Sequence, residues 1–424
     1  MTLRRLKAFS TASLLVCSVG AANTSFADRL SDALNAALTH HPAVAGQAAM
    51  VESRRFAADR ARSQRYPTLS AQAQSDGGYS SVTGDSYSPA VLRLRQPIYA
   101  FGRINSSIAV ANADMDAEKA DLMRVRRQLL EETAVAYAFV RGSNERIEVA
   151  RQNVAEHGAL LAQIERRVEG QLASSADARL AAARLAQARA QLGRAISEWQ
   201  GANLELGALT QVTISAEEPV PMGLLALGED TDLLNRAMEY NADIQYKKQM
   251  LAKAEAEVKE AKTYSMPTIY LQADRYHDQP GLQDTNHVGI VFEATLDGMG
   301  FAARGRRGEA AASKMAASQD LAAARIQLQE ELDQLQRNRR LQTELIELQT
   351  QSLLDLESLL ASYQRQYESG TKSWLDLLNI QREYYEQRRQ LVQARNDWVI
   401  YSLRLQARIG GLDGLVALDE QTDG

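Results

Sequence analysis

The segment Tyr66-Pro67-Thr68-Leu69-Ser70-Ala71-Gln72-Ala73 returns 200 residues later as Met266-Pro267-Thr268-Ile269-Tyr270-Leu271-Gln272-Ala273. The same offset holds without a gap back to Asp32 and Asp232, and small shifts carry the match further along both halves. A repeat of this length exceeds the roughly 20–50 residues of solenoid units. The sequence therefore predicts two copies of one domain rather than an array of short repeats.

Each copy then shows apolar residues alternating with polar ones, which predicts a hairpin. The four predicted strands are 67–76, 89–98, 267–276 and 287–296. Segments of about ten residues with one apolar face are typical of transmembrane barrel strands, although a soluble hairpin lying on helices shows the same alternation. Four strands cannot close a barrel of useful bore, and lipid does not tolerate open sheet edges. The sheet is therefore expected to close with strands of other chains.

Long helices are predicted from the placement of proline. None of the eight prolines lies between residues 98 and 218 or after residue 280, and these stretches are rich in Ala, Leu, Glu, Gln and Arg. Proline interrupts helical hydrogen bonds, so its absence favours uninterrupted helices. Apolar residues spaced by three and four, as from Leu353 to Tyr367, are typical of coiled coils. The expected helices are 30–63, 102–168, 175–209, 231–263, 304–367 and 373–409.

The first 27 residues have the pattern of an export signal. Arg4, Arg5 and Lys7 precede a short apolar stretch, and Ser25-Phe26-Ala27 supplies small residues for cleavage. Cys17, the only cysteine, raises a lipoprotein alternative, but Val16 before it is too large for a lipidation site. Cleavage after Ala27 would leave a thiol-free chain, which suits an oxidising compartment.

The charge and hydropathy of the chain limit the classes of partner that it can bind. Loss of the three positive signal residues moves the formal net charge from −5 to −8. An acidic chain of this kind is not built for nucleic acid. No segment after residue 27 is long and apolar enough for a transmembrane helix, so entry into a membrane would require strands in a closed barrel.

These patterns predict a mainly α fold with β strands and the following division of the chain. A signal peptide covers 1–27, a first repeat covers 28–215 with its hairpin at 67–98, a linker covers 216–230, a second repeat covers 231–412 with its hairpin at 267–296, and a polar tail covers 413–424.

Several segments of the chain resemble the TolC family of outer-membrane efflux and secretion channels. They are the openings Leu34-Asn35-Ala36-Ala37 and Leu234-Asn235-Arg236-Ala237, the strand starts quoted above, the turn from Arg95 to Arg103, and the segment from Tyr367 to Asp376. The form Gln96-Pro97-Ile98-Tyr99-Ala100-Phe101-Gly102-Arg103 most resembles the branch that serves type I secretion, including LapE-like channels that export large adhesins.

The resemblance implies a homotrimer in the outer membrane of a Gram-negative cell. Three chains would each give four strands to a twelve-stranded β-barrel in outer-membrane lipid, and their helices would continue it as an α-barrel through the periplasm. A periplasmic adaptor protein and an inner-membrane ABC exporter or RND pump would dock at the far end. The expected function is the exit duct of such a tripartite export system, with no enzymatic activity and no cofactor.

The resemblance also implies a periplasmic gate, formed by the positions that match the family's tip residues: Asp177, Tyr367, Lys372, Asp376 and Asn379. In relatives a tyrosine and an arginine bond an aspartate of the first-copy tip, and rings of aspartate narrow the pore. Here Lys372 replaces the arginine and cannot make its bidentate fork. Asn379 replaces a second aspartate. An alternative is that Asp177 and Lys372 are ordinary solvated residues at helix starts.

Two other functions remain open at the level of sequence besides secretion. One is the outer-membrane component of a multidrug efflux pump, and the other is a soluble periplasmic coiled-coil adaptor. An enzyme is not indicated, because the five histidines show no metal-ligand spacing and Gly298-Met299-Gly300 lacks the spacing of a dinucleotide loop. The adjacent His40 and His41 are expected in a loop.

Overall fold

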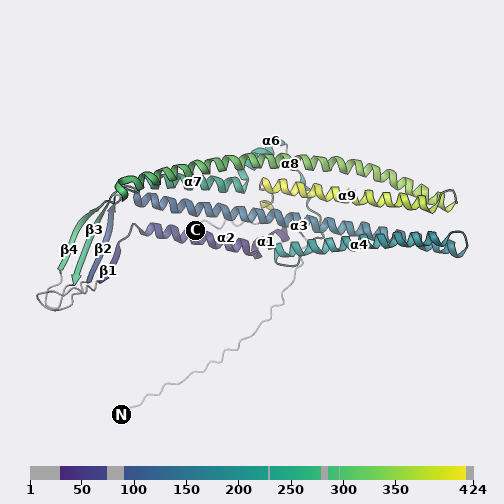
Figure 1. Ribbon diagram of the computed structural model, residues 1–424, viewed down its shortest axis with the longest axis horizontal. Helices are drawn as coiled ribbons and strands as arrows, with labels where there is room; N and C mark the ends of the chain where they lie inside the picture. The colour runs from purple at the N-terminus through teal and green to yellow at the C-terminus, as the bar shows by residue number, and fades with distance from the viewer. Residues whose placement is uncertain (1–28, 74–89, 228–229, 278–284, 296, 417–424) are drawn as a thin grey trace, which may run out of the picture.

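The computed structural model describes residues 29–73, 90–227, 230–277, 285–295 and 297–416. The predicted signal peptide with Cys17 and its cleavage site, the two hairpin loops, and the tail after residue 416 lie outside the described residues. The described part is a long rod, with the strands at one end and the α3–α4 and α8–α9 connections between helices at the other (Figure 1).

The two copies have the same order of helices and strands, apart from the short 3-10 helix η1 in the second. The first contains α1 (Leu30–His40), α2 (Pro42–Ser63), β1 (Thr68–Ala73), β2 (Ala90–Tyr99), α3 (Arg103–Glu169) and α4 (Ser175–Thr210). The second contains α6 (Asp230–Tyr240), α7 (Ala242–Thr263), β3 (Thr268–His277), β4 (Thr285–Glu293), η1 (Asp297–Gly300), α8 (Phe301–Glu368) and α9 (Trp374–Arg408). The short helix α5 (Met222–Leu225) lies between the copies, and η2 (Asp413–Leu415) follows them.

The predicted single helices 30–63 and 231–263 are wrong, since each is broken into two. Pro42 lacks an N–H and occupies the first turn of α2, where none is needed, and the His41 ring accepts a hydrogen bond from the Ala43 N–H at 3.2 Å. His41 is therefore a helix cap, whereas His40 ends α1. Asn241 plays the same part in the second copy, where its side chain accepts from the Asp243 and Ile244 N–H groups.

The long helices α3 and α8 contain 67 and 68 residues. At 1.5 Å per residue each is about 100 Å long. In Figure 1, α2 and α4 follow one another along α3, and α7 and α9 do so along α8, which gives four parallel rows of helix. None of the helices among the described residues is long and apolar enough to cross a membrane.

The four strands form one antiparallel sheet in the order β1-β2-β3-β4, with β1 and β4 at its edges. Pairing of Leu94 with Leu69 and Ala273, and of Leu271 with Ile290, places the predicted apolar residues on one face. The four predicted strands and the alternation of their faces are therefore confirmed within the described residues, except that β4 ends at Glu293, before the predicted end. Arg275, which pairs with Leu92, lies on the same face as the apolar residues.

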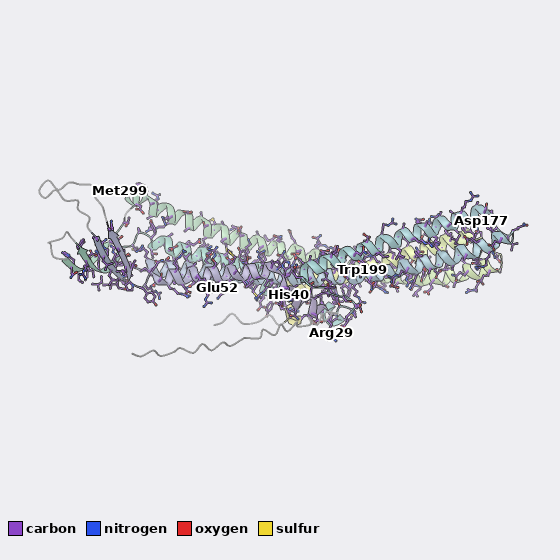
Figure 2. All side chains as sticks on the ribbon, turned by 90° about the horizontal axis from the view of Figure 1, so that it is seen from below. Arg29, His40, Glu52, Asp177, Trp199 and Met299 are labelled. Carbon is purple, nitrogen blue, oxygen red and sulfur yellow. The ribbon has the colours of Figure 1, made fainter. Side chains whose placement is uncertain are left out.

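A buried core joins the two copies midway along the rod. Leu34 of α1, Tyr137 of α3, Leu206 of α4 and Leu403 of α9 are each at most 1% exposed and belong to one apolar cluster. The predicted linker packs into this cluster through buried side chains, and the Tyr137 hydroxyl donates to its Glu218 carbonyl oxygen at 2.9 Å. The first residues of the predicted polar tail also pack, because Val416 is buried in the same cluster. Figure 2 shows His40, Arg29 and Trp199 in this middle region.

Candidate functional site at the helical tip and the sheet

The predicted gate residues lie together at the end of the rod far from the sheet. The α3–α4 turn and the α8–α9 turn both reach this end, where Figure 2 labels Asp177. Gln171 and Gly370 turn the chain with positive φ angles of 60° and 79°. Leu160, Ile164 and Leu378 form a buried core between the two turns, so the tip is one packed unit.

Asp177 and Asp376 each close a capping box at the start of a helix. Asp177 accepts from the Ser174 N–H at 3.0 Å, and Ser174 accepts from the Asp177 N–H at 3.2 Å. Asp376 and Ser373 repeat this arrangement in α9. Hydrogen bonds from the Ser174 backbone and hydroxyl lower the pKa of Asp177, and those from the Ser373 hydroxyl and backbone lower the pKa of Asp376. Both aspartates are therefore ionised at neutral pH.

The other gate residues have partners within the chain. Tyr367 is 3% exposed, and the Arg167 guanidinium carbon lies 4.4 Å from its ring centre. The Lys372 ammonium lies 4.7 Å from the centre of the Tyr363 ring. In this one chain, as far as it is described, Asp177 and Lys372 share no ion pair, so the structure gathers the gate residues without joining these two. Asn379 is exposed on the second turn of α9.

Sequence reasoning missed Arg167 as a tip residue. With Gly170 placed on Gly370, Arg167 occupies the position of Tyr367 in the other copy. A comparison of the two copies at the tip would therefore have identified it. Its cation–π contact joins the end of α3 to the end of α8.

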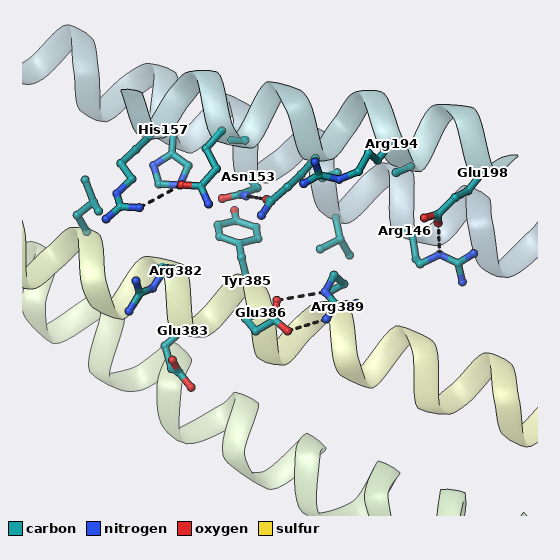
Figure 3. Close-up of a pocket in the computed structure, with 18 residues that line it drawn as sticks. Arg146, Asn153, His157, Arg194, Glu198, Arg382, Glu383, Tyr385, Glu386 and Arg389 are labelled. Atoms are coloured by element: carbon teal, nitrogen blue, oxygen red, sulfur yellow. Dashed lines mark hydrogen bonds and ion pairs between the residues drawn. The ribbon is translucent and has the colours of Figure 1, made fainter. Parts of the chain in front are cut away.

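A groove of about 630 Å³ runs between α3, α4 and α9 on the tip side of the middle region. Figure 3 shows Tyr385 pointing from α9 toward Asn153 of α3, and the Glu198 carboxylate facing Arg146 at 3.6 Å. Burial and the nearby Arg184 lower the pKa of His157, which keeps this ring neutral at neutral pH. In the part of the chain that the structure describes, no group of three or more His, Cys, Asp or Glu residues could hold a metal ion.

The sheet has two chemically different faces. On the apolar face, Val288, Ile290 and Phe292 are 75%, 73% and 64% exposed in the single chain. On the polar face, ion pairs cross the strands at 2.9 Å between Arg93 and Asp274 and at 2.8 Å between Arg95 and Glu293. A further hydrogen bond joins Arg95 to Gln272 at 2.9 Å. Several large apolar side chains exposed together on one face indicate an apolar surrounding, and the paired charges suit an aqueous lumen.

Comparison with known proteins agrees with this architecture. The family model of the outer membrane efflux protein matches residues 33–210 and 233–411. No individual curated protein matches the chain significantly in sequence.

Solved structures of low sequence identity share the fold over about nine tenths of this chain. CusC is 15% identical with a TM-score of 0.81, over 91% of this chain and 92% of that one. VceC of Vibrio cholerae is 20% identical with a TM-score of 0.76, over 90% and 96% of the two chains. The open state of MtrE of Neisseria gonorrhoeae is 19% identical with a TM-score of 0.76, over 91% and 90%.

The chain belongs to the outer membrane efflux protein family, also known as the TolC family. It is an outer-membrane channel that extends into the periplasm and serves a tripartite export system. It is a transport protein and not an enzyme. Family membership leaves no place for the alternative of a soluble periplasmic adaptor.

Proposed function

We propose that this channel is the exit duct for type I secretion of a large, adhesin-like protein. The observation that carries the proposal is the turn from Gln96 to Arg103, whose sequence resembles the secretion branch of the family. In the structure this turn joins β2 directly to α3, at the point where the sheet meets the helical shaft. The inner-membrane partner would then be an ABC exporter with its periplasmic adaptor.

The unpaired edges of the sheet support a trimer. Among the described residues, β1 and β4 each have a partner strand on one side only. Pairing of β4 with β1 of the next chain would join three sheets into a twelve-stranded barrel, with the apolar face toward lipid and the Arg93–Asp274 and Arg95–Glu293 pairs lining the lumen.

Deletion of the gene tests the choice of substrate. We expect the deletion strain to lose secretion of a large surface adhesin while its sensitivity to drugs changes little. Secretion is measured by surface labelling of the adhesin, and drug sensitivity by minimal inhibitory concentrations. Normal secretion together with sharply raised drug sensitivity would assign the channel to a multidrug RND pump instead. Complementation with the intact gene is the control.

We further propose that the tip is the closed gate of the duct. Asp177 of one chain would bond Lys372 of its neighbour with Tyr367 assisting, and Asp376 would form a ring of three carboxylates with Asn379 behind it. The capping boxes hold both aspartates at fixed positions and keep them charged. Exposed ion pairs are weak and screened by salt, so a docking partner could open such a gate.

A double substitution tests the gate. Asp177→Ala with Lys372→Ala should raise the single-channel conductance in planar bilayers, because the neighbouring tips lose their mutual attraction. The matched control is Glu165→Ala with Arg166→Ala, which removes one charge of each sign from exposed positions of α3 near the same tip. Equal conductance of the double variant and the wild type would place the constriction elsewhere.

A further inference from the structure

The two turns that lead from the sheet into the long helices share an unusual feature. Aligning Gly102 with Gly300 places Phe101 on Met299. Both of these residues have positive φ angles, 48° for Phe101 and 57° for Met299. Bulky residues rarely adopt this conformation, which glycine reaches at no steric cost. Both copies nevertheless place a large apolar side chain there, and the side chains are 41% and 86% exposed.

These side chains continue the lipid-facing surface of the sheet toward the periplasm. Ile98 and Tyr99, which precede the first turn, are 58% and 57% exposed. The Tyr99 and Phe101 rings meet edge to face with their centres 4.6 Å apart. Figure 2 shows Met299 at the sheet end of the molecule. Tyrosine and tryptophan are concentrated at the level of lipid headgroups, so Tyr99 indicates that the first turn lies where the membrane surface is expected.

The first turn also has a groove of about 280 Å³ with a positive end. Its apolar wall includes Ile98, Tyr99 and Phe101, and Arg65 lines it as the one charged residue. The Arg65 side chain is exposed, and among the described residues it donates a hydrogen bond to the side-chain oxygen Oδ1 of Asn105 at 3.0 Å. The Gln96 amide donates to the Arg65 carbonyl oxygen at 3.0 Å, which fixes the backbone of Arg65 beside the groove.

In the second turn Arg306 contacts a side chain of the same chain, although Met299 itself is 86% exposed. Ser265 stands where the first copy has Arg65. The Tyr264 hydroxyl donates to Asp297 at 3.0 Å, and the Arg306 guanidinium carbon lies 3.7 Å from the centre of the Tyr264 ring. The cation of this turn is therefore engaged within the chain, whereas Arg65 faces an open apolar groove.

We propose that the groove at the first turn binds one phospholipid of the periplasmic leaflet per chain. The lipid phosphate pairs with the Arg65 guanidinium, and an acyl chain lies along Ile98, Tyr99 and Phe101. Charge complementarity and the continuity of the groove with the exposed apolar face of the sheet both favour a lipid. Met299 contacts the membrane without holding a headgroup. The proposal rests on the lipid-facing assignment of the sheet and goes beyond the export function.

Native mass spectrometry of the delipidated channel tests the site, with phosphatidylglycerol as the probe. The wild type should bind it up to one molecule per chain. Arg65→Gln removes a charge-assisted contact and should weaken binding about tenfold. Phe101→Gly should weaken it about tenfold or more, because apolar contact is lost. Glycine suits the positive φ of this position, so Phe101→Gly is not expected to impair folding.

The matched controls lie in the second copy. Met299→Gly relieves the same backbone strain at the equivalent turn, and Arg307→Gln removes an exposed charge near it. Both should bind phosphatidylglycerol as the wild type does. Diacylglycerol, which lacks the phosphate, should bind about tenfold more weakly than phosphatidylglycerol.

Three results would overturn the proposal. They are unchanged binding by Arg65→Gln, an equal loss in Met299→Gly, and displacement of the lipid by inorganic phosphate at equal concentration. Lipid binding is measured on the purified channel. Normal secretion in the deletion strain would therefore contradict the proposed function but would not contradict the lipid site.

Discussion

Ile290→Arg should prevent most of the protein from assembling in the outer membrane. Ile290 is 73% exposed on the apolar face of β4, opposite Leu271 of β3. An arginine on the lipid face of a barrel strand costs about 2–4 kcal/mol at the middle of the bilayer. Heat-modifiable trimer in purified outer membranes measures the effect, and the variant should be found mainly as degraded or periplasmic chain.

The adjacent Val291 supplies the matched control for this prediction. Val291 pairs with Tyr270 on the opposite face of the sheet, two residues before Glu293. Val291→Arg introduces the same side chain into the same strand, but on the face that carries the Arg95–Glu293 pair. It should assemble far better than Ile290→Arg. If both variants failed to the same extent, the assignment of the two faces would be wrong.

The faces of the sheet could be predicted from sequence because a strand repeats every two residues. The alternation alone therefore assigns one common face to Leu92, Leu94 and Ile290, without any knowledge of the fold. The pairing within each hairpin followed from the duplication, since each copy supplies one hairpin, whereas the pairing of β2 with β3 was not predicted. The long helices could also be predicted from the sequence, because the absence of proline and the regular spacing of apolar residues are local properties of the chain.

The breaks at residues 41 and 241 were not predicted, because the local sequence there is compatible both with a helix start and with a continuous helix. Pro42 was included within a helix, yet proline is tolerated in the first turn, where it marks a beginning rather than an interior position. Asn241 carries an N-cap signal, but the apolar residues Leu233 and Ile244 on either side pack into one cluster and continue the helical pattern across it. The spacing of apolar residues alone therefore cannot distinguish a helix that ends and restarts at a cap from a helix that continues.

The contacts of the tip and of the middle region could not be predicted because they join residues far apart in the chain. Arg167 meets Tyr367, and the predicted linker is held by Tyr137, through packing that only the completed fold defines. The gate positions came from resemblance to a family and not from their spacing. The structure explains Asp177 and Asp376 as helix caps, which is compatible with a second role between chains.

A network of charges in the middle region joins the two copies through Arg408. This side chain, at the end of α9, donates to Glu131 of α3 and to Glu331 of α8, the latter at 2.6 Å. The Arg408 and Glu131 side chains are 25% and 15% exposed. Burial raises the pKa of Glu131 above the ordinary glutamate value, although Arg408 opposes this shift. Arg408 therefore stabilises the charged form of a largely buried carboxylate.

Arg408→Met should destabilise the channel by about 3 kcal/mol at neutral pH, because removal of one partner leaves a buried charge uncompensated. The effect should be smaller in acid. A carboxyl group with a raised folded-state pKa destabilises the fold when ionised, and this penalty is absent below the unfolded value of 4.5. The pKa of Glu131 should rise further in the variant, so its stability should recover as the pH falls toward 4.5. Thermal unfolding followed by circular dichroism at several pH values measures this recovery.

The double variant Glu131→Gln with Arg408→Met separates loss of the charge pair from loss of packing. Glutamine keeps the size of the Glu131 side chain but carries no charge, so this variant should be markedly more stable than Arg408→Met at neutral pH. Its stability should also change less between neutral pH and pH 4.5, since Glu131 no longer titrates. Equal stability of the single and double variants at neutral pH would show that the arginine acts through its apolar stem, and that the charges joining the two copies contribute nothing measurable.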